Sequence, residues 1–190
     1  MFGQIAEFLI ETVAAFLVFL LLARFHFQWL RVPFRNPVGD FIVACTNWIV
    51  YPARRAVPSL GGLDLATWLA AWLVQGCALY VTLALRGWDA GARIGAALAG
   101  LAALAFVDLL RFSVYILMLA VVVQAVMSWV NPYHALATVF DAMTRRFLRP
   151  LRRVVPPIAN VDLSPLVLII LLQVLLIPLA HLRAQLGTLL

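Results

Sequence analysis

The sequence contains little charge and no lysine at all. Charged residues make up 12% of its 190 positions, and the fourteen basic residues are all arginine. Hydrophobic residues reach 65% and the mean hydropathy is +1.03, which lies well outside the range of soluble domains. The scarcity of charge therefore excludes an ordinary water-soluble domain and indicates a chain that resides in a lipid bilayer.

Residues that carry out chemistry are equally scarce. The two cysteines and three histidines do not fall into a C-x-x-C, H-E-x-x-H or other metal-binding spacing. The sequence also lacks a Gly-rich phosphate loop, a Ser-His-Asp arrangement and a paired-carboxylate motif. We therefore predict no catalytic residue, no metal site and no cofactor, and a chain that is not an enzyme.

Four long apolar stretches predict an all-α membrane protein with four transmembrane helices. A hydrocarbon core about 30 Å thick needs roughly 20 apolar residues of helix, and backbone groups in lipid must be satisfied within that helix. The stretches cover about 5–22, 65–85, 106–130 and 165–182. We do not expect the first to be a cleavable secretion signal, because its start is acidic and no A-x-A site follows it.

A seven-residue motif, Pro-x-Arg-Arg-x-Val-Pro, occurs twice with an offset of 98 residues. The first copy spans Pro52–Pro58 and the second spans Pro150–Pro156. With the same offset and no gap, ten of the thirty positions in 46–75 are identical to their counterparts. This level of identity indicates a tandem duplication of a basic segment that precedes a long apolar run.

Each repeat reads as a helix, an amphipathic segment, the basic motif and a second helix. We divide the chain into a first repeat, 1–86, a linker rich in small residues, 87–105, and a second repeat, 106–190. The repeats are expected to be parallel, because an even number of spans preserves orientation. The linker is either half-inserted or an outward extension of the third spanning helix. Its Gly91 and Gly95 form a G-x-x-x-G, which leaves a homo-oligomer open.

Arginine placement predicts how the chain sits in the membrane, because basic loops are retained in the cytoplasm. Ten arginines lie in the connections between the first and second spans and between the third and fourth, against three on the opposite side. We predict a multi-pass protein of the bacterial inner membrane with both termini in the periplasm. This sorting also accounts for the pI of 10.4, so no nucleic-acid partner is predicted.

The motif supplies candidate binding residues at the level of the lipid headgroups. A basic residue close to an anionic membrane contributes on the order of 1 kcal/mol, and the planar arginine fork suits phosphate. The predicted lipid- or partner-binding residues are Arg54, Arg55, Arg145, Arg149, Arg152 and Arg153. The alternative is that these amphipathic segments only cover the ends of the spanning helices.

The prolines and aspartates around the motif are predicted to have structural roles. Because proline fixes φ and stops a helix, the two prolines of each motif should bound a turn. We expect Asp64 to be the N-cap of the second span and Ser164 that of the fourth. Alternatively, the aspartate of each repeat pairs with the upstream arginines and closes the turn. The residues concerned are Pro52, Pro58, Asp64, Pro150, Pro156, Asp162, Ser164 and Pro165.

Polar residues within the spans are further candidates, because they are costly in lipid. Gln75 and Gln173 occupy matching positions near the centres of the second and fourth spans. We expect them to hydrogen-bond across the interface between the repeats, with Gln124 as a third member. The alternative is that Gln75 and Gln173 line a path for an ion.

Four charged residues lie near the outer ends of the first and third spans. They are Glu7, Glu11, Asp108 and Arg111. We expect them to sit at the water boundary, where a charge costs little. The alternatives are a small network between these two helices or a wet outer vestibule.

The whole pattern resembles the YggT family in its two-copy form. The resemblance rests on an apolar span ending near Trp29 or Trp129, the amphipathic segment, the arginine motif, and Asp-Leu before a second span. It covers about 5–85 and 106–185. It implies a small integral membrane protein without known catalytic residues. Relatives are connected with cell-division or nucleoid organisation, with osmotic or potassium tolerance and, in chloroplasts, with maturation of a membrane cytochrome.

Three functions follow as hypotheses. The first is a non-enzymatic scaffold or assembly factor in envelope or cell-division organisation, which binds anionic phospholipid, or a membrane or division protein, through its basic cytoplasmic turns. The second is a small channel or transport component linked to osmotic or potassium tolerance. The third is a cytochrome-maturation helper that would hold haem through His26 or His134.

Overall fold

The computed structural model describes residues 2–58, 63–88, 94–131, 133–155 and 162–188. These residues form six α-helices: α1 (Phe2–Trp29), α2 (Pro37–Ala56), α3 (Leu65–Leu85), α4 (Ile94–Val130), α5 (Ala135–Val154) and α6 (Ser164–Gly187). Four of them, α1, α3, α4 and α6, are long and apolar enough to cross a membrane. The predicted class, an all-α membrane protein with four spanning helices, is confirmed.

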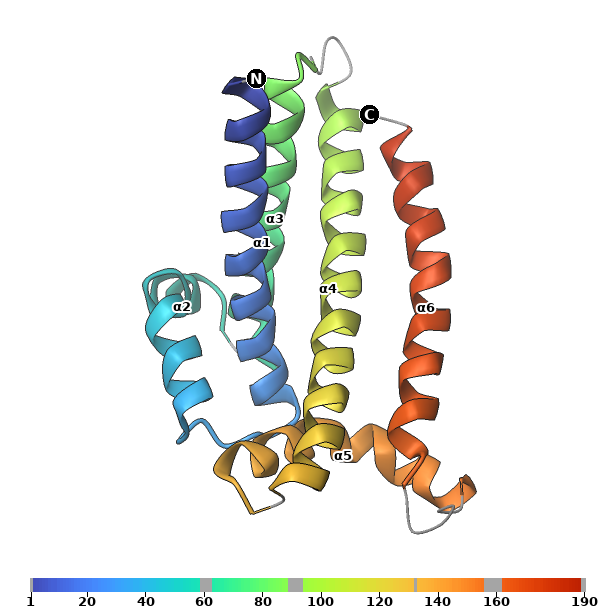
Figure 1. The fold of residues 1–190 in the computed structure, drawn as a ribbon. Helices are drawn as coiled ribbons and strands as arrows, with labels where there is room; N and C mark the ends of the chain where they lie inside the picture. Colours follow the sequence, from blue (N-terminus) through green and yellow to red (C-terminus); the bar gives the residue numbers. More distant parts are fainter. Residues whose placement is uncertain (1, 59–62, 89–93, 132, 156–161, 189–190) are drawn as a thin grey trace.

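The two repeats have the same orientation in the bundle. α1 and α4 run in one direction, whereas α3 and α6 run in the other (Figure 1). α1 packs against α3, α4 packs against α6, and α3 joins the two halves by packing against α4. The first turn of α1 and the last turn of α6 consequently lie at the same end of the bundle (Figure 1).

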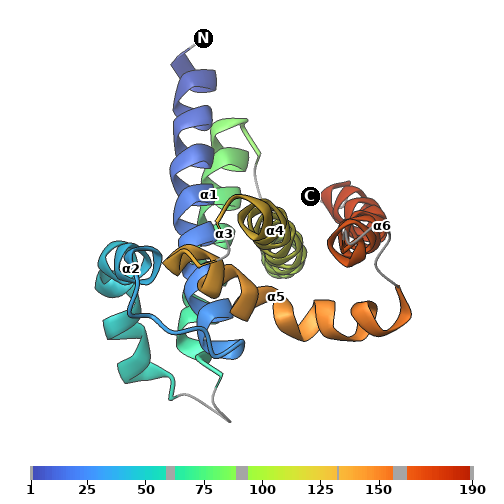
Figure 2. The same cartoon turned by 60° about the horizontal axis from the view of Figure 1, so that its bottom comes forward.

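The two shorter helices are amphipathic, and each packs against the spanning helices of its own repeat. α2 lies beside α1 and α3, whereas α5 runs across the lower ends of α4 and α6 (Figure 1, Figure 2). The buried residues of α5 recur at helical spacing and are Ala137, Val139, Met143, Thr144 and Leu148. Those of α2 are Gly39, Ile42, Thr46 and Val50. Each repeat is therefore a helix, an amphipathic helix and a helix, as predicted.

The first proline of each motif does not end its helix, which contradicts the expectation of a proline-bounded turn. Pro52 lies inside α2 and Pro150 lies inside α5. Both prolines are exposed, so water can satisfy the carbonyl that loses its N–H partner.

The helices end instead at the valine before the second proline. Val57 and Val155 have extended backbones, with ψ of 110° and 105°, as a following proline favours. Each Arg-Arg pair therefore occupies the last helical turn, where cations interact favourably with the helix dipole. Pro58 is exposed, and Pro156 lies outside the described residues.

The described part of the linker, residues 94–105, is an outward extension of the third spanning helix. α4 begins at Ile94 and continues to Val130. Trp72 on α3 donates from Nε1 to the Ala102 carbonyl over 2.9 Å. Trp68 packs edge-on against Phe106, with 5.7 Å between ring centroids. These contacts hold the extension against α3; Gly91 lies outside the described residues.

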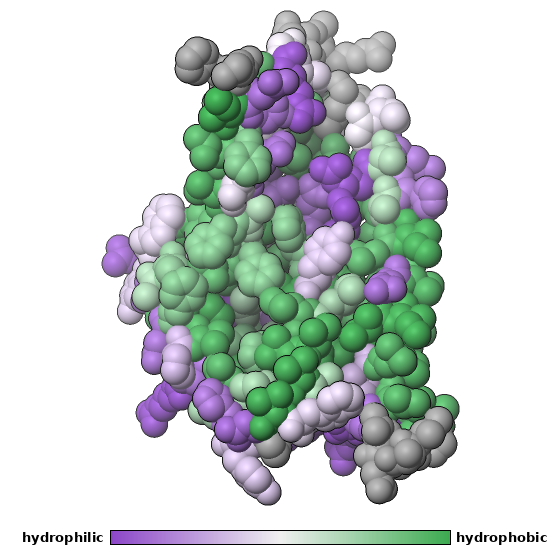
Figure 3. Space-filling model, viewed as in Figure 1, coloured by the Kyte–Doolittle hydropathy of each residue, from purple (hydrophilic) through white to green (hydrophobic). Residues whose placement is uncertain are grey.

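Hydrophobic side chains cover the middle of the bundle, and hydrophilic ones gather toward both ends (Figure 3). The outward faces of the spanning helices carry large apolar side chains, among them Phe8, Leu119 and Ile170. In the most apolar stretch of α6 only 17% of the residues are buried. An apolar surface of this extent is costly in water and identifies the face that contacts lipid.

Candidate functional site

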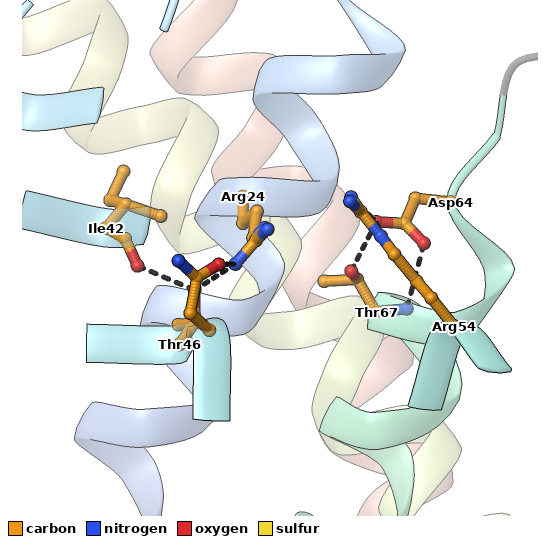
Figure 4. A network of polar contacts seen from close by, with 7 residues as sticks. Arg24, Ile42, Thr46, Arg54, Asp64 and Thr67 are labelled. Carbon is orange, nitrogen blue, oxygen red and sulfur yellow. Dashed lines mark hydrogen bonds and ion pairs between the residues drawn. The ribbon is translucent and has the colours of Figure 1, made fainter. Parts of the chain in front are cut away.

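An ion pair closes the first elbow, the connection between α2 and α3. Arg54 donates from Nη2 to Asp64 Oδ2 over 2.6 Å. Asp64 is the N-cap of α3, and its carboxylate accepts the backbone N–H and the hydroxyl of Thr67 (Figure 4). Gln28 accepts from Arg54 at 2.7 Å and donates to Asp64 at 3.0 Å when its amide is oriented to suit them. Asp64 thus combines capping with pairing to the upstream arginine.

The second elbow, between α5 and α6, repeats the pair in a more open form. Arg152 donates from Nε to Asp162 Oδ2 over 2.8 Å. The Asp162 side chain is 41% exposed, against 4% for Asp64. Ser164 is the first helical residue, and not the expected N-cap, because Leu163 takes that position. Asp162 Oδ1 accepts the Ser164 N–H over 2.9 Å and so satisfies the helix start from one residue further back.

Both elbow carboxylates are stabilised as anions. Burial alone would raise the pKa of Asp64, but the hydrogen bonds from Arg54 and Thr67 outweigh it and hold that pKa below its ordinary value. The same balance lowers the pKa of Asp162, where the Ser164 backbone N–H acts together with Arg152. At neutral pH both elbows therefore carry an intact ion pair.

A buried arginine ties α1 to α2. Arg24 is 5% exposed, and its Nη1 donates to Thr46 Oγ1 over 2.8 Å and to Asn47 Oδ1 over 2.9 Å. Thr46 in turn donates to the Ile42 carbonyl over 2.6 Å (Figure 4). Thr144, the matching residue of the second repeat, is also fully buried, but among the described residues its hydroxyl bonds only to carbonyls of its own helix. Because a buried charge is costly without partners, this network fixes the position of α2.

Five arginines surround a hollow at the end of the bundle where α5 lies. The hollow has a volume of about 540 Å³ and lies between α5 and the segment that follows α1. We call it the arginine basin, and its charged residues are Arg31, Arg145, Arg146, Arg149 and Arg153. Three of these, Arg145, Arg149 and Arg153, recur every fourth residue and so share one face of α5.

The arginine basin carries excess positive charge within the described part of the chain. Arg145 pairs with Asp141, one helical turn away, over 2.5 Å. Arg146 stacks over the Trp29 ring, with its guanidinium carbon 5.5 Å from the ring centroid. Arg31 is placed by a left-handed backbone with φ of 56°, which is uncommon for a residue with a side chain. Several planar cations around one hollow suit the oxygens of a phosphate group.

The predicted binding arginines separate into three groups. Three line the arginine basin, namely Arg145, Arg149 and Arg153. Two, Arg54 and Arg152, are held by the elbow aspartates. Arg55 is exposed at the end of α2. The structure therefore concentrates the candidate binding residues on α5 and gives the first arginine of each motif a structural contact.

Sequence reasoning missed two members of the basin. Arg146 was not singled out, although it follows Arg145 directly on the same amphipathic helix. Arg31 lies more than a hundred positions earlier, after α1, and no spacing rule brings it to α5. The two segments meet through the fold, where Trp29 packs against Phe147, at 6.4 Å between ring centroids, and Val32 shares a hydrophobic core with Met143.

The intramembrane glutamines do not form the expected network. Gln75 is buried and donates to Asp108 Oδ2 over 3.0 Å. Gln173 is exposed on α6, so the matched glutamines neither meet between the repeats nor line a shared path. Gln124 is 8% exposed, and its Oε1 has no hydrogen-bond partner among the described residues. The symmetry fails because α3 packs on α1, α2 and α4, whereas the main neighbours of α6 are α4 and α5.

Two of the histidines contact the backbone of their own helices. His26 Nδ1 lies 2.7 Å from the Leu22 carbonyl. His134 is the N-cap of α5 and accepts the Leu136 N–H over 3.2 Å. No cluster of three or more His, Cys, Asp or Glu side chains that could hold a metal occurs in the part of the chain that the structure describes.

The fold and its charge pattern define a multi-pass helical membrane protein built from two parallel repeats, each with an arginine-bearing elbow. The sequence matches the CCB3/YggT family over residues 3–85 and 103–183, one segment in each repeat. The chain belongs to the CCB3/YggT family.

Relatives in three bacteria match most of the chain. The uncharacterized protein YggT of Escherichia coli K12 is 32% identical over 96% of this chain and 93% of its own length. The uncharacterized protein in the proC 3' region of Vibrio alginolyticus is 34% identical, over 88% and 89%. The uncharacterized protein PA0392 of Pseudomonas aeruginosa is 27% identical, over 85% and 81%. No solved structure matches the chain.

Proposed function

We propose that this protein is a non-enzymatic scaffold or assembly factor of the bacterial inner membrane that binds anionic phospholipid headgroups in its arginine basin. The proposal rests on one observation, the convergence of five arginines from two segments around a single hollow. Only Arg145 of these five has a carboxylate partner among the described residues. The guanidinium groups without a carboxylate partner are exposed and can form charge-assisted hydrogen bonds to the oxygens of a phosphate group.

The charge distribution favours a cytoplasmic position for the arginine basin. Segments rich in arginine are retained in the cytoplasm, and the anionic lipids of that leaflet attract basic side chains near its surface. α5 presents its apolar face to the bundle and keeps its arginines exposed, the arrangement of a helix that lies in the headgroup layer. Both termini then lie in the periplasm, since they occupy the opposite end of the bundle (Figure 1).

Binding of this kind would place the protein at anionic regions of the membrane. Each basic residue near the surface contributes on the order of 1 kcal/mol, so four arginines without a carboxylate partner contribute roughly 4 kcal/mol. This corresponds to an enrichment of roughly a thousandfold over a neutral lipid surface. A protein so enriched can anchor a membrane-bound or division partner in envelope organisation, which is the scaffold role we propose.

Lipid binding by two double variants, one inside the arginine basin and one outside it, tests whether the basin holds the lipid. The protein, purified in a neutral detergent, is titrated with short-chain phosphatidylglycerol and, separately, with short-chain phosphatidylcholine, and bound lipid is counted by native mass spectrometry. The basin variant is Arg149→Gln with Arg153→Gln. The matched control is Arg35→Gln with Arg55→Gln, two exposed arginines outside the basin. Both variants lose the same charge.

We expect the basin variant to hold the phosphatidylglycerol of the arginine basin about 30-fold more weakly, because two arginines contribute about 2 kcal/mol. The control should stay within about threefold of the unmodified protein, and phosphatidylcholine should bind weakly to all three. Equal losses in the basin variant and the control would mean that diffuse charge, and not the arginine basin, attracts lipid. That result would overturn the proposed function.

A further inference from the structure

A second polar site lies at the other end of the bundle, away from the arginine basin. It is a cleft of about 280 Å³ to which all four spanning helices contribute, and we call it the outer cleft. Its polar lining includes Glu11, Gln75, Asp108, Arg111, Tyr115 and Arg183. The structure thus places one carboxylate, Asp108, deep between the helices, where an ionisable group is expensive and marks a functional site by default.

Asp108 is the centre of the outer cleft and is fully engaged. It is 4% exposed and receives hydrogen bonds from α3 and α6. Gln75 donates to its Oδ2 over 3.0 Å, and Arg183 donates from Nε to its Oδ1 over 2.6 Å. One carboxylate therefore holds three helices together.

Arg111 lies beside Asp108 but is poorly satisfied. Its Nη1 is 3.5 Å from Asp108 Oδ1, and its Nη2 is 3.4 Å from the Tyr115 hydroxyl, both at the limit of a hydrogen bond. Its Nε is buried and has no partner among the described residues. A guanidinium in a membrane span with its donors unmet is costly. The Arg111 guanidinium therefore has room for a further hydrogen-bond acceptor.

The charges lining the outer cleft cancel overall, and its excess positive charge is confined to one wall. Asp108 is shared between two arginines, Arg111 and Arg183, which leaves one positive charge on the wall formed by α4 and α6. The carboxylate on the α1 wall, Glu11, faces Arg86, 3.8 Å away at the end of α3. Arg86 also pairs with Glu7. Glu7 and Glu11 thus pair with Arg86, and they do not form the network with α4 that was the alternative to a place at the water boundary.

We infer that the outer cleft binds an oxyanion, the phosphate group of a phospholipid headgroup from the outer leaflet. The anionic oxygens would accept hydrogen bonds from the unmet N–H groups of Arg111. Arg183 and the Tyr115 hydroxyl lie in the same cleft as further donors. Hydrophilic side chains appear on the side of the bundle in its upper half, bordered by hydrophobic surface (Figure 3). A site open to the side admits a headgroup while the acyl chains stay in lipid. Free phosphate has the same chemistry and is the second source to test.

Cysteine protection tests this inference without removing the arginine. Ala78→Cys, in the lining of the outer cleft but not among the proposed donors, is placed in a chain with Cys45→Ser and Cys77→Ser, and its rate of reaction with a maleimide is measured in detergent. Short-chain phosphatidylglycerol should slow the reaction at least fivefold, whereas inorganic phosphate should not. If inorganic phosphate alone slows the reaction, the outer cleft binds an oxyanion, but the bound ion is free phosphate and not a lipid headgroup. If neither compound slows the reaction, the inference is wrong.

Two further variants separate the outer cleft from the arginine basin. With Ala78→Cys present, Arg111→Gln should remove the protection, and Arg111→Lys should keep part of it, since a charge remains. The basin variant, Arg149→Gln with Arg153→Gln, should leave the protection intact, because it lies at the other end of the bundle. A loss of protection in the basin variant but not in Arg111→Gln would contradict the site. Failure of one proposal can thus be told from failure of the other.

Discussion

Arg54 and Asp64 lie ten residues apart in the sequence and 2.6 Å apart in the structure, and Arg152 and Asp162 repeat this relationship at 2.8 Å. The two pairs differ in their surroundings. The Asp64 side chain is 4% exposed and the Asp162 side chain is 41% exposed. The duplication has therefore produced one closed elbow and one open elbow from the same motif.

Removing the arginine should cost more in the closed elbow than in the open one. Arg54→Gln leaves Asp64 as a buried carboxylate without its cation, which we expect to destabilise the protein by about 2 to 3 kcal/mol. Arg152→Gln exposes its aspartate to water and should cost less than about 1 kcal/mol. The free energy of unfolding in mixed detergent micelles measures both. Equal costs would mean that burial of Asp64 does not strengthen its elbow.

The first elbow should also make stability depend on pH in the acid range. The folded-state pKa of Asp64 is lowered, so its stabilisation is complete above the ordinary pKa of about 3.9 and is lost as the pH falls through the lower, folded-state value. The difference in Tm between the unmodified protein and Asp64→Asn should be constant near neutral pH and shrink below about pH 4. A difference that grows on acidification would contradict the lowered pKa.

The matching threonines Thr46 and Thr144 should respond differently to the same substitution. Thr46→Val removes a hydrogen bond from the buried Arg24 and should cost about 1.5 to 3 kcal/mol. Thr144→Val removes only bonds to its own helix and should cost less than about 1 kcal/mol. Thermal unfolding of both variants in detergent provides the comparison. A larger loss for Thr144→Val would show that Arg24 does not depend on α2.

Gly39 should tolerate no side chain, because its α-carbon faces the backbone at the start of α2. A Cβ there would lie 2.2 Å from the Phe34 carbonyl oxygen, so Gly39→Ala should destabilise the protein by roughly 1 to 3 kcal/mol. Gly76 on α3 is the control, since its nearest contact would be an ordinary 3.9 Å to Ala105. Gly76→Ala should be neutral or stabilise by up to about 1 kcal/mol. Similar Tm values for both variants would contradict the close approach.

Much of the fold could be predicted from the sequence because its determinants are local or periodic. Spans, amphipathic segments and the duplication depend on runs and spacings that a chain displays directly. Asp64 could be assigned as a cap, because capping acts over three residues. Pro52 was misjudged because a proline on an exposed helical face loses only one hydrogen bond, which water can replace.

Contacts between distant segments could not be predicted in the same way. Gln75 and Gln173 match in sequence, yet one is buried and the other exposed, because packing around α3 and α6 differs. The duplication therefore misled the prediction where the two repeats meet. Arg31 reaches the arginine basin through the fold alone, and the partner of Asp108 on α6, Arg183, likewise had no signal in the sequence.

The most direct test of the central claim, two arginine-bearing elbows on the cytoplasmic side, is site-specific labelling in a chain with Cys45→Ser and Cys77→Ser. Single variants Arg55→Cys and Arg153→Cys are exposed to a membrane-impermeant maleimide in spheroplasts and in inverted inner-membrane vesicles. We predict that both react in the inverted vesicles and stay unlabelled in spheroplasts. Reaction of the two positions from opposite sides, or of both from the outside, would contradict the parallel repeats and the cytoplasmic arginine basin.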